Sequence, residues 1–407
     1  MRVLVCVLLL AASLGAKVLT PVWIELGPES AVLARAVVDL AEDCPTLKAD
    51  GKPLHMAVRE PVPENFKPAC EASIPAHTRS LKFGKNTLHL PNKSNEIVVI
   101  GDTGCRIKAD YIQACDDPNQ WPFPIVARQI ARTKPDFIIH VGDYLYRETP
   151  CPGEVSACQG PTGDNWSAWE ADFFSPAAEA LRAAPWAFSR GNHENNKRSC
   201  KGWFYYLDPR PFDGTCTQYS KPYVAQVAGL RIGMLDSAST TDDGKPHPDE
   251  TEVFAAQLRE LSGKVDWIVD HHPFWLFQYD RQKKQLVATG GALEPAWESA
   301  KPTGVTLLLA GHVHLFEFIG FGGNRPNQLV AGDAGTQLDV QVGPSGDHAQ
   351  TGPGIAANAG EVAPRFGFTE MHRVGDSWNF ELKDARGAVL LECDFVDKAS
   401  ASCRGQK

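Results

Sequence analysis

The sequence predicts a layered α/β fold, and two observations support this prediction. Short runs of β-branched and apolar residues recur after about residue 92 of the 407-residue chain, and stretches with helical apolar spacing separate several of them. Strands that alternate with helices are typical of sheets covered by helices. The expected strands are residues 97–100, 137–141, 186–189, 230–235, 265–269, 305–309 and 328–331, and the expected helices include residues 125–131, 177–184 and 253–261.

The segment before these runs has a different character. Residues 17–91 are irregular and rich in proline, with a strand–turn–strand pattern at residues 81–90. We therefore expect residues 17–91 to form a small β-rich N-terminal domain or subdomain, and residues 92–407 to form the main domain.

The first 16 residues resemble a signal peptide. Arg2 supplies a positive charge, residues 3–10 are apolar, and small residues follow up to Ala16. The alternative is a short membrane anchor, but the apolar run is far below the roughly 20 residues that span a bilayer. We expect a secreted or periplasmic protein without a membrane attachment after cleavage.

The cysteines agree with export. The chain has 11 cysteines, and ten remain once Cys6 is removed with the leader. An even number in an exported protein favours disulfides. Pairing neighbours is the simplest arrangement, and it joins Cys44–Cys70, Cys105–Cys115, Cys151–Cys158, Cys200–Cys216 and Cys393–Cys403.

The net charge restricts the partners. A formal charge of −9 opposes binding to nucleic acid, which requires a basic surface. An acidic surface does not attract anionic substrates from a distance either. Recognition of a phosphate would therefore need cations held at the site.

Polar clusters follow five of the seven expected strands. Ligands of open α/β sheets bind outside the carboxyl ends of the strands, so these clusters should converge. Taken alone, each cluster can be explained as a turn or a structural histidine. Five clusters in this order favour one site for two cations, because carboxylates and imidazoles are the ligands that such cations need. The clusters are Gly-Asp-Thr-Gly at 101–104, Gly-Asp-Tyr-Leu-Tyr at 142–146, Gly-Asn-His-Glu at 191–194, His-His-Pro at 271–273 and Gly-His-Val-His at 311–314.

The five clusters resemble those of the metallophosphoesterase (calcineurin-like) superfamily. Most members begin with Asp-x-His, whereas this chain has Gly104 in place of that histidine and Tyr146 at the end of the second cluster. Asp-x-Gly with Gly-Asp-x-x-Tyr resembles the purple acid phosphatase branch. The resemblance covers residues 96–314 by motif. It implies a four-layer α/β/β/α sandwich and hydrolysis of phosphate monoesters by in-line attack of metal-bound hydroxide.

The resemblance also implies a set of ligands for two metal ions. The first ion would be ferric iron, and the second would be divalent iron, zinc or manganese. Either His271 or His272 fits the fourth motif, and the family spacing before proline favours His271. Carried over by position, Asp102, Tyr146 and His314 would hold the first ion, Asp143 would bridge, and Asn192, His271 and His312 would hold the second.

Residues next to the clusters have expected roles that rest on less specific sequence signals. His193 would assist departure of the leaving group, and Glu194 would orient His193 or a neighbouring group. Arg147 follows Tyr146 and is expected in a surface ion pair rather than on phosphate. Four tryptophans near the motifs either line the cleft or belong to the core, namely Trp166, Trp169, Trp203 and Trp275.

Together these features predict an exported phosphatase that acts on small phosphate esters. The alternatives are a phosphodiesterase on the same two-metal site and, from another class, a non-catalytic protein that binds metal or phosphate.

Overall fold

The structure is a computed structural model. It describes residues 17–405, except 109–110, 152–159, 244, 246, 281–284, 323–324, 340–349, 352–356, 358, 376 and 397–399. The expected signal peptide and Cys158 lie outside the described residues. Within them, no helix is long and apolar enough to cross a membrane.

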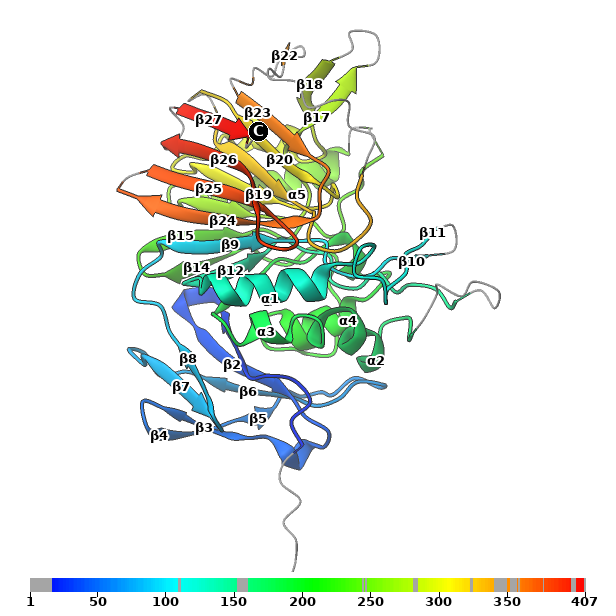
Figure 1. Cartoon of the computed structure of the whole chain (residues 1–407), viewed down its shortest axis with the longest axis vertical. Helices are drawn as coiled ribbons and strands as arrows, with labels where there is room; N and C mark the ends of the chain where they lie inside the picture. Colours follow the sequence, from blue (N-terminus) through cyan, green and yellow to red (C-terminus); the bar gives the residue numbers. More distant parts are fainter. Residues whose placement is uncertain are drawn as a thin grey trace, which may run out of the picture.

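The larger of two main sheets contains eleven strands among the described residues. Its centre is the parallel trio β9, β12 and β13. C-terminal strands lie on one flank and N-terminal strands on the other (Figure 1). In sheet order the strands are β27 (Ser400–Gly405), β26 (Val389–Val396), β25 (Ser377–Asp384), β24 (Gly367–Val374), β9 (Glu96–Ile100), β12 (Phe137–His140), β13 (Trp186–Phe188), β1 (Trp23–Leu26), β2 (Val32–Val37), β6 (Ala69–Ser73) and β5 (Ala57–Val58).

A second sheet packs against the first. In the described part of the chain it has seven strands, of which β15, β16, β19 and β21 are parallel. In sheet order the strands are β14 (Tyr223–Val227), β15 (Leu230–Met234), β16 (Trp267–Val269), β19 (Leu307–Ala310), β21 (Asn327–Ala331), β20 (Phe316–Gly320) and β23 (Ala359–Ala363).

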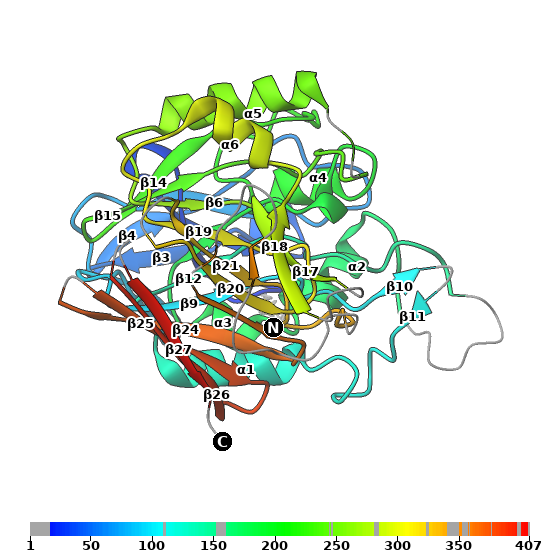
Figure 2. The same cartoon turned by 90° about the horizontal axis from the view of Figure 1, so that it is seen from above.

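Helices cover the outer face of each sheet. Figure 2 shows α1 on one side of the molecule and α5 with α6 on the opposite side. The helices are α1 (Phe123–Thr133), α2 (Trp166–Trp169), α3 (Ala178–Leu181), α4 (Cys200–Gly202), α5 (Pro248–Leu261) and α6 (Glu294–Ala300), with short 3-10 or π turns η1 (Pro28–Ser30), η2 (Ala41–Asp43), η3 (Glu170–Phe174), η4 (Asn192–Glu194) and η5 (Trp203–Leu207).

Alternating side chains of β9 show how the layers are held together. Val98 and Ile100 are buried in the core beneath the helices that include α1 and α3. Ile97 and Val99 point to the other face, into the core between the two sheets. A third core lies between the second sheet and helices α5 and α6. Two sheets with helices outside both confirm the predicted α/β/β/α sandwich, and the seven predicted strands and three predicted helices are present.

The N-terminal segment is joined to the main sheet. Strand β1 is parallel to β13, with Glu25 opposite Trp186, and β2, β6 and β5 continue the sheet outward. A separate sheet packs on this flank through its own core. It consists of β4 (Lys52–His55), β3 (Thr46–Ala49), β7 (Ser80–Phe83) and β8 (Asn86–His89). The pair β7–β8 confirms the predicted strand–turn–strand, while the boundary at residue 91 stays a prediction.

Two small sheets lie in the connections of the sandwich. One pairs β10 (Ile107–Lys108) with β11 (Tyr111–Ile112), and the other contains β17 (Trp275–Asp280), β18 (Gln285–Gly290) and β22 (Gln350–Thr351).

Four disulfides have the predicted partners. Cys44–Cys70 lies in the N-terminal segment, Cys105–Cys115 follows the first motif, Cys200–Cys216 follows the third, and Cys393–Cys403 links β26 to β27. The fifth proposed pair includes Cys158 and is therefore outside the described residues.

Candidate metal centre

Both main sheets bring polar residues to one place. Asp102, Asp143 and Asn192 follow β9, β12 and β13 of the first sheet, while His271 and the cluster at 311–314 follow β16 and β19 of the second. Because the strands of each group are parallel, their carboxyl ends meet along the same edge. All seven predicted ligand residues lie in this cluster through the contacts described below.

Three acidic groups meet in the first half of the cluster. The Tyr146 hydroxyl oxygen lies 2.8 Å from Oδ1 of Asp102 and 2.7 Å from Oδ2 of Asp143. It also lies 3.0 Å from Nε2 of His314. These side chains are fully or almost fully buried. A phenol has one proton, which it can donate to only one of these neighbours.

The other half of the cluster combines an amide with imidazoles. Oδ1 of Asn192 lies 2.9 Å from Nε2 of His271 and 3.2 Å from Nδ1 of His312. Nε2 of His271 is also 3.3 Å from Oδ2 of Asp143. Asp143 therefore contacts both halves, which is the position expected of a bridging ligand.

The second nitrogen of each histidine is held by an acceptor outside the cluster. Nδ1 of His271 donates to the Val141 carbonyl at 2.9 Å, and Nδ1 of His314 donates to the Gln337 carbonyl at 2.8 Å. Nε2 of His312 lies 3.2 Å from Oδ2 of Asp242. Acceptors of this kind fix the tautomer and leave the other nitrogen lone pair directed at a metal.

The backbone is strained where it carries these ligands. Asp102, Asp143 and His312 have φ angles of 53°, 62° and 72°, in the left-handed region that side chains other than glycine seldom adopt. Such conformations persist only where surrounding structure enforces them, and they concentrate at functional sites.

Gly104 leaves room for Tyr146. A Cβ atom on Gly104 would lie 2.9 Å from Cδ2 of Tyr146 and 2.6 Å from the Tyr144 carbonyl oxygen. It would also lie 2.8 Å from Oδ2 of Asp172. The turn as folded here therefore has no room for any side chain at residue 104, a histidine included.

Glu194 holds the loop that contains Asp143. Its carboxylate accepts hydrogen bonds from the backbone N–H groups of Tyr144 (2.9 Å), Leu145 (3.0 Å), Asp143 (3.2 Å) and Gly191 (3.2 Å). Of the two roles predicted for Glu194, the structure shows the orientation of a neighbouring group, namely this loop.

Asp172 supports the adjacent turn and was not expected from the sequence. It accepts from the backbone N–H of Tyr146 at 2.8 Å and pairs with Nε of Arg147 at 2.7 Å. Arg147 is only 4% exposed, so the predicted surface ion pair is in fact a buried one.

His193 lies beside the cluster, with a carboxylate on its other side. Nε2 of His193 is 3.8 Å from Oδ2 of Asp143, and Nδ1 is 2.8 Å from Oε1 of Glu148. Its ring also packs on Tyr146, with 3.8 Å between the ring centroids. Glu148 was missed in the sequence because it follows the motif in a loop whose path the spacing does not define.

The structure separates the two adjacent histidines of the fourth motif. His271 directs Nε2 into the cluster, whereas Nδ1 of His272 lies 3.1 Å from the Ser237 hydroxyl. The four tryptophans near the motifs are at most 7% exposed and belong to the apolar cores, which decides between their two predicted roles.

Burial and neighbouring charges perturb the pKa values of the cluster. Burial raises the pKa of Asp102 well above its usual range. Burial acts the same way on Asp143, but the charges of His271 and His193 outweigh it and hold that pKa well below its usual range. Burial lowers the pKa of His271, yet Asp143 and Asp102 more than compensate and raise it to about 10. The buried carboxylate of Asp143 thus requires positive charge close by.

A metal cation fits this requirement. Ligand atoms of Asp102, Asp143 and His271 all lie within 4.8 Å of one another. Carboxylate, phenol, amide and imidazole groups offer the donors that divalent and trivalent metals bind in proteins. The cluster is a candidate metal-binding site.

The comparisons with known proteins agree with this geometry. The family called Calcineurin-like phosphoesterase matches residues 96–316, which is more than half of the chain. The chain belongs to this family and is a metal-dependent phosphoester hydrolase. The resemblance to the metallophosphoesterase superfamily is thereby confirmed.

Solved structures share the fold at low sequence identity. One is a purple acid phosphatase from seeds of yellow lupin (Lupinus luteus), with a TM-score of 0.54, 14% identity and coverage of 90% of this chain and 72% of the lupin chain. Another is PhoD, with a TM-score of 0.56, 11% identity and coverage of 95% and 92%. No curated protein matches the sequence.

Proposed function

We propose that this chain is a dinuclear phosphatase that hydrolyses small phosphate monoesters. The observation that carries the proposal is the orientation of His271, His312 and His314. Each has one ring nitrogen at an acceptor outside the cluster and the other directed at Asn192 or Tyr146. Histidines arranged only for packing have no reason to share this orientation.

The contacts divide the ligands into two sets around Asp143. Asp102, Tyr146 and His314 would hold one cation, and Asn192, His271 and His312 would hold the other. The phenol and carboxylates suit ferric iron, while the amide and imidazoles suit divalent iron, zinc or manganese. Two bound cations would supply Lewis acidity and charge neutralisation to the phosphate ester.

His193 would serve the leaving group. The Glu148 carboxylate, 2.8 Å from its Nδ1, and the ring of Tyr146 hold the imidazole beside the cluster. Nε2 faces the cluster, where, when it carries a proton, it would donate that proton to the departing alkoxide. Glu194 and Asp172 would keep the loop at residues 142–146 in place while this happens.

We also propose that the protein is exported. The four described disulfides support an oxidising compartment. Mass spectrometry of protein from the native host tests this point, because cleavage near residue 16 would remove the leader. An N-terminus that retained Met1 would argue for an anchor instead.

Hydrolysis of two chromogenic esters tests the activity. We expect purified protein to cleave p-nitrophenyl phosphate faster than bis-p-nitrophenyl phosphate, with maximal rate below neutral pH. Preference for the diester would support the phosphodiesterase alternative. No hydrolysis of either ester by metal-loaded protein would indicate a narrow substrate pocket or a binding protein.

Metal analysis of Asp143→Ala tests the site. The substitution should remove both ions, because Asp143 contacts both halves of the cluster, and should reduce hydrolysis to the uncatalysed level. Asp116→Ala is the matched control, since Asp116 is exposed and outside the cluster. Full metal content in Asp143→Ala would contradict the bridging role.

A further inference from the structure

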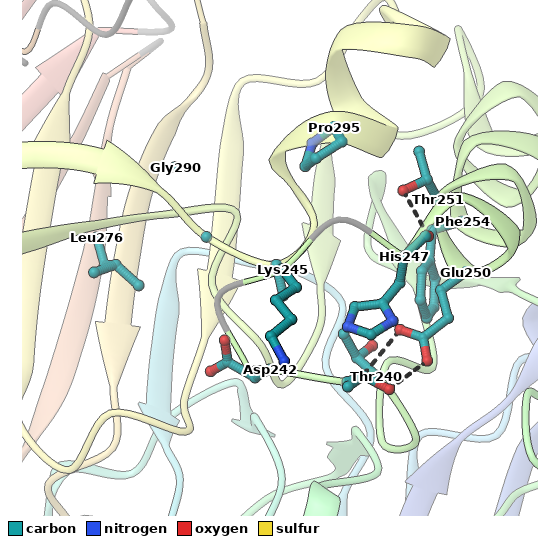
Figure 3. A pocket seen from close by; sticks show the side chains of 13 residues that line it. Thr240, Asp242, Lys245, His247, Glu250, Thr251, Phe254, Leu276, Gly290 and Pro295 are labelled. Atoms are coloured by element: carbon teal, nitrogen blue, oxygen red, sulfur yellow. Dashed lines mark hydrogen bonds between the residues drawn. The ribbon is translucent and has the colours of Figure 1, made fainter. Parts of the chain in front are cut away.

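A cavity adjoins the metal cluster and has no role in the proposal above. Its volume is about 370 Å³, within the size range of small-molecule sites. The cavity lies between the segment that leads into α5, the end of β18 and the start of α6 (Figure 3). Its lining residues include Thr240, Asp242, Lys245, Leu276 and Pro295.

Asp242 connects this cavity to the cluster. One of its carboxylate oxygens lies 3.2 Å from Nε2 of His312, which is a proposed metal ligand. Its side chain is nevertheless 47% exposed, so the carboxylate can also accept from a molecule in the cavity. A phosphate ester held at the cluster would therefore have space for its alcohol portion next to Asp242.

The lining offers several hydrogen-bonding groups. Oγ1 of Thr240 is buried behind the cavity wall and out of reach of an occupant, so the groups that remain are those of Lys245 and Asp242. The Lys245 side chain is 76% exposed, and its ammonium is 3.9 Å from the nearest oxygen of Asp243. In Figure 3 this side chain lies between Asp242 and His247. An ammonium donor and a carboxylate acceptor thus share one cavity.

The charges of the lining oppose a strongly anionic occupant. Two carboxylates, those of Asp242 and Glu250, line the cavity together with one lysine, Lys245. His247 also lines it, but its Nε2 lies 2.8 Å from Oδ1 of Asp243. A second phosphate would be repelled by the two carboxylates. Leu276 and Pro295 add apolar surface that suits the C–H face of a sugar. A neutral, hydroxyl-rich molecule fits this combination.

A second cavity also approaches the cluster but is less suitable. Gln337, whose carbonyl accepts from His314, lines a cavity of about 310 Å³ with Gln113 and Gln120. The side-chain amides of Gln113 and Gln120 are hydrogen-bonded to backbone groups of the protein itself. Those groups are therefore already used in holding the loop.

We infer that the cavity beside Asp242 binds the alcohol portion of the substrate, and that this alcohol is a neutral polyol of about the size of a monosaccharide. The inference rests on the proposed phosphatase function. Lys245 and Asp242 determine specificity for the polyol, while the metal cluster receives the phosphate.

Binding of two phosphonates tests the inference without turnover. The probes are the phosphonate analogue of glucose 6-phosphate and methylphosphonate, measured by calorimetry with the metal-loaded full chain. We expect the sugar phosphonate to bind on the order of tenfold more tightly, because it gains hydrogen bonds that methylphosphonate lacks. Lys245→Ala should remove about three- to tenfold of this advantage and leave the affinity for methylphosphonate unchanged.

The controls separate the two proposals. Lys85→Ala removes an exposed lysine of the N-terminal segment and should change neither affinity. Equal affinity of the protein for both probes would refute the polyol site. An equal loss of affinity for both probes in Lys245→Ala would refute it as well. Tighter binding of a sugar bisphosphonate would refute a neutral occupant. If p-nitrophenyl phosphate is hydrolysed in any of these cases, the proposed function stands; absence of hydrolysis and of binding by either phosphonate would refute both proposals.

Discussion

Replacement of Glu194 should both destabilise the protein and empty the metal site. Its carboxylate accepts four backbone N–H groups and is fully buried. Glu194→Ala leaves these donors without an acceptor, and at about 1 kcal/mol for each bond the loss of unfolding free energy is roughly 4 kcal/mol. In Glu194→Gln one oxygen can keep the bonds from Tyr144 and Leu145, so we expect roughly 2 kcal/mol.

The metal content should change for a related reason. Asp143 has a φ angle of 62°, a conformation that costs on the order of 1–3 kcal/mol and depends on the bonds from Glu194. When two or four bonds are lost, the loop can relax and withdraw the Asp143 carboxylate from the cluster. The metal content should therefore be highest in the native protein, lower in Glu194→Gln and lowest in Glu194→Ala.

Urea unfolding and elemental analysis measure the two effects. Glu42→Ala is the control, because Glu42 is exposed, and it should change stability by less than about 0.5 kcal/mol. If Glu194→Gln retained native stability and a full complement of metal, the explanation through four backbone bonds would be wrong.

Three further predictions address separate parts of the molecule. Tyr146→Phe should abolish any violet colour of the iron-loaded protein while circular dichroism remains native; colour that persisted would exclude Tyr146 as an iron ligand. Glu148→Gln removes the negative charge 2.8 Å from His193 and should lower kcat/KM for phenyl phosphate about tenfold. The effect on p-nitrophenyl phosphate should be smaller, because its leaving group needs less protonation. Equal effects on the two esters would contradict a role through His193. Burial raises the pKa of Glu317 from 4.5 to about 8, so between these pH values the folded state retains a proton that the unfolded chain releases. As pH rises from 4.5 to 8, the native protein should therefore lose roughly 5 kcal/mol of unfolding free energy relative to Glu317→Gln. Parallel curves of stability against pH for the two proteins would refute this sign.

The sequence was informative about the cluster because of how parallel sheets are built. A polar residue directly after a buried strand must lie at the carboxyl edge, so Asp102, Asp143 and His271 could be placed together without knowledge of the loops. Their immediate partners could not. Glu148 and Asp242 reach His193 and His312 from loops, where a change of one residue alters the direction of the side chain.

Burial of charge was the other point that the sequence left open. Arg147 is polar and lies beside a motif, which favours the surface in the absence of a known partner. Its partner Asp172 lies in the η3 turn, and nothing in the spacing connects the two. The attachment of the N-terminal segment was likewise hidden, because Glu25, Arg35 and Tyr206 form a buried network across separate parts of the chain.

The order of strands in the larger sheet has a consequence for biosynthesis. β9 carries Asp102 at its end and is paired on one side with β24, where Thr369 lies opposite Val99. During translation β9 emerges long before β24, so one edge of the central strands stays open until nearly the whole chain has been made. Exposed strand edges are templates for aggregation, and such non-local pairing slows folding. We therefore expect chains that end before residue 367 to aggregate, and heterologous production of the intact protein to benefit from a chaperone that shields this edge.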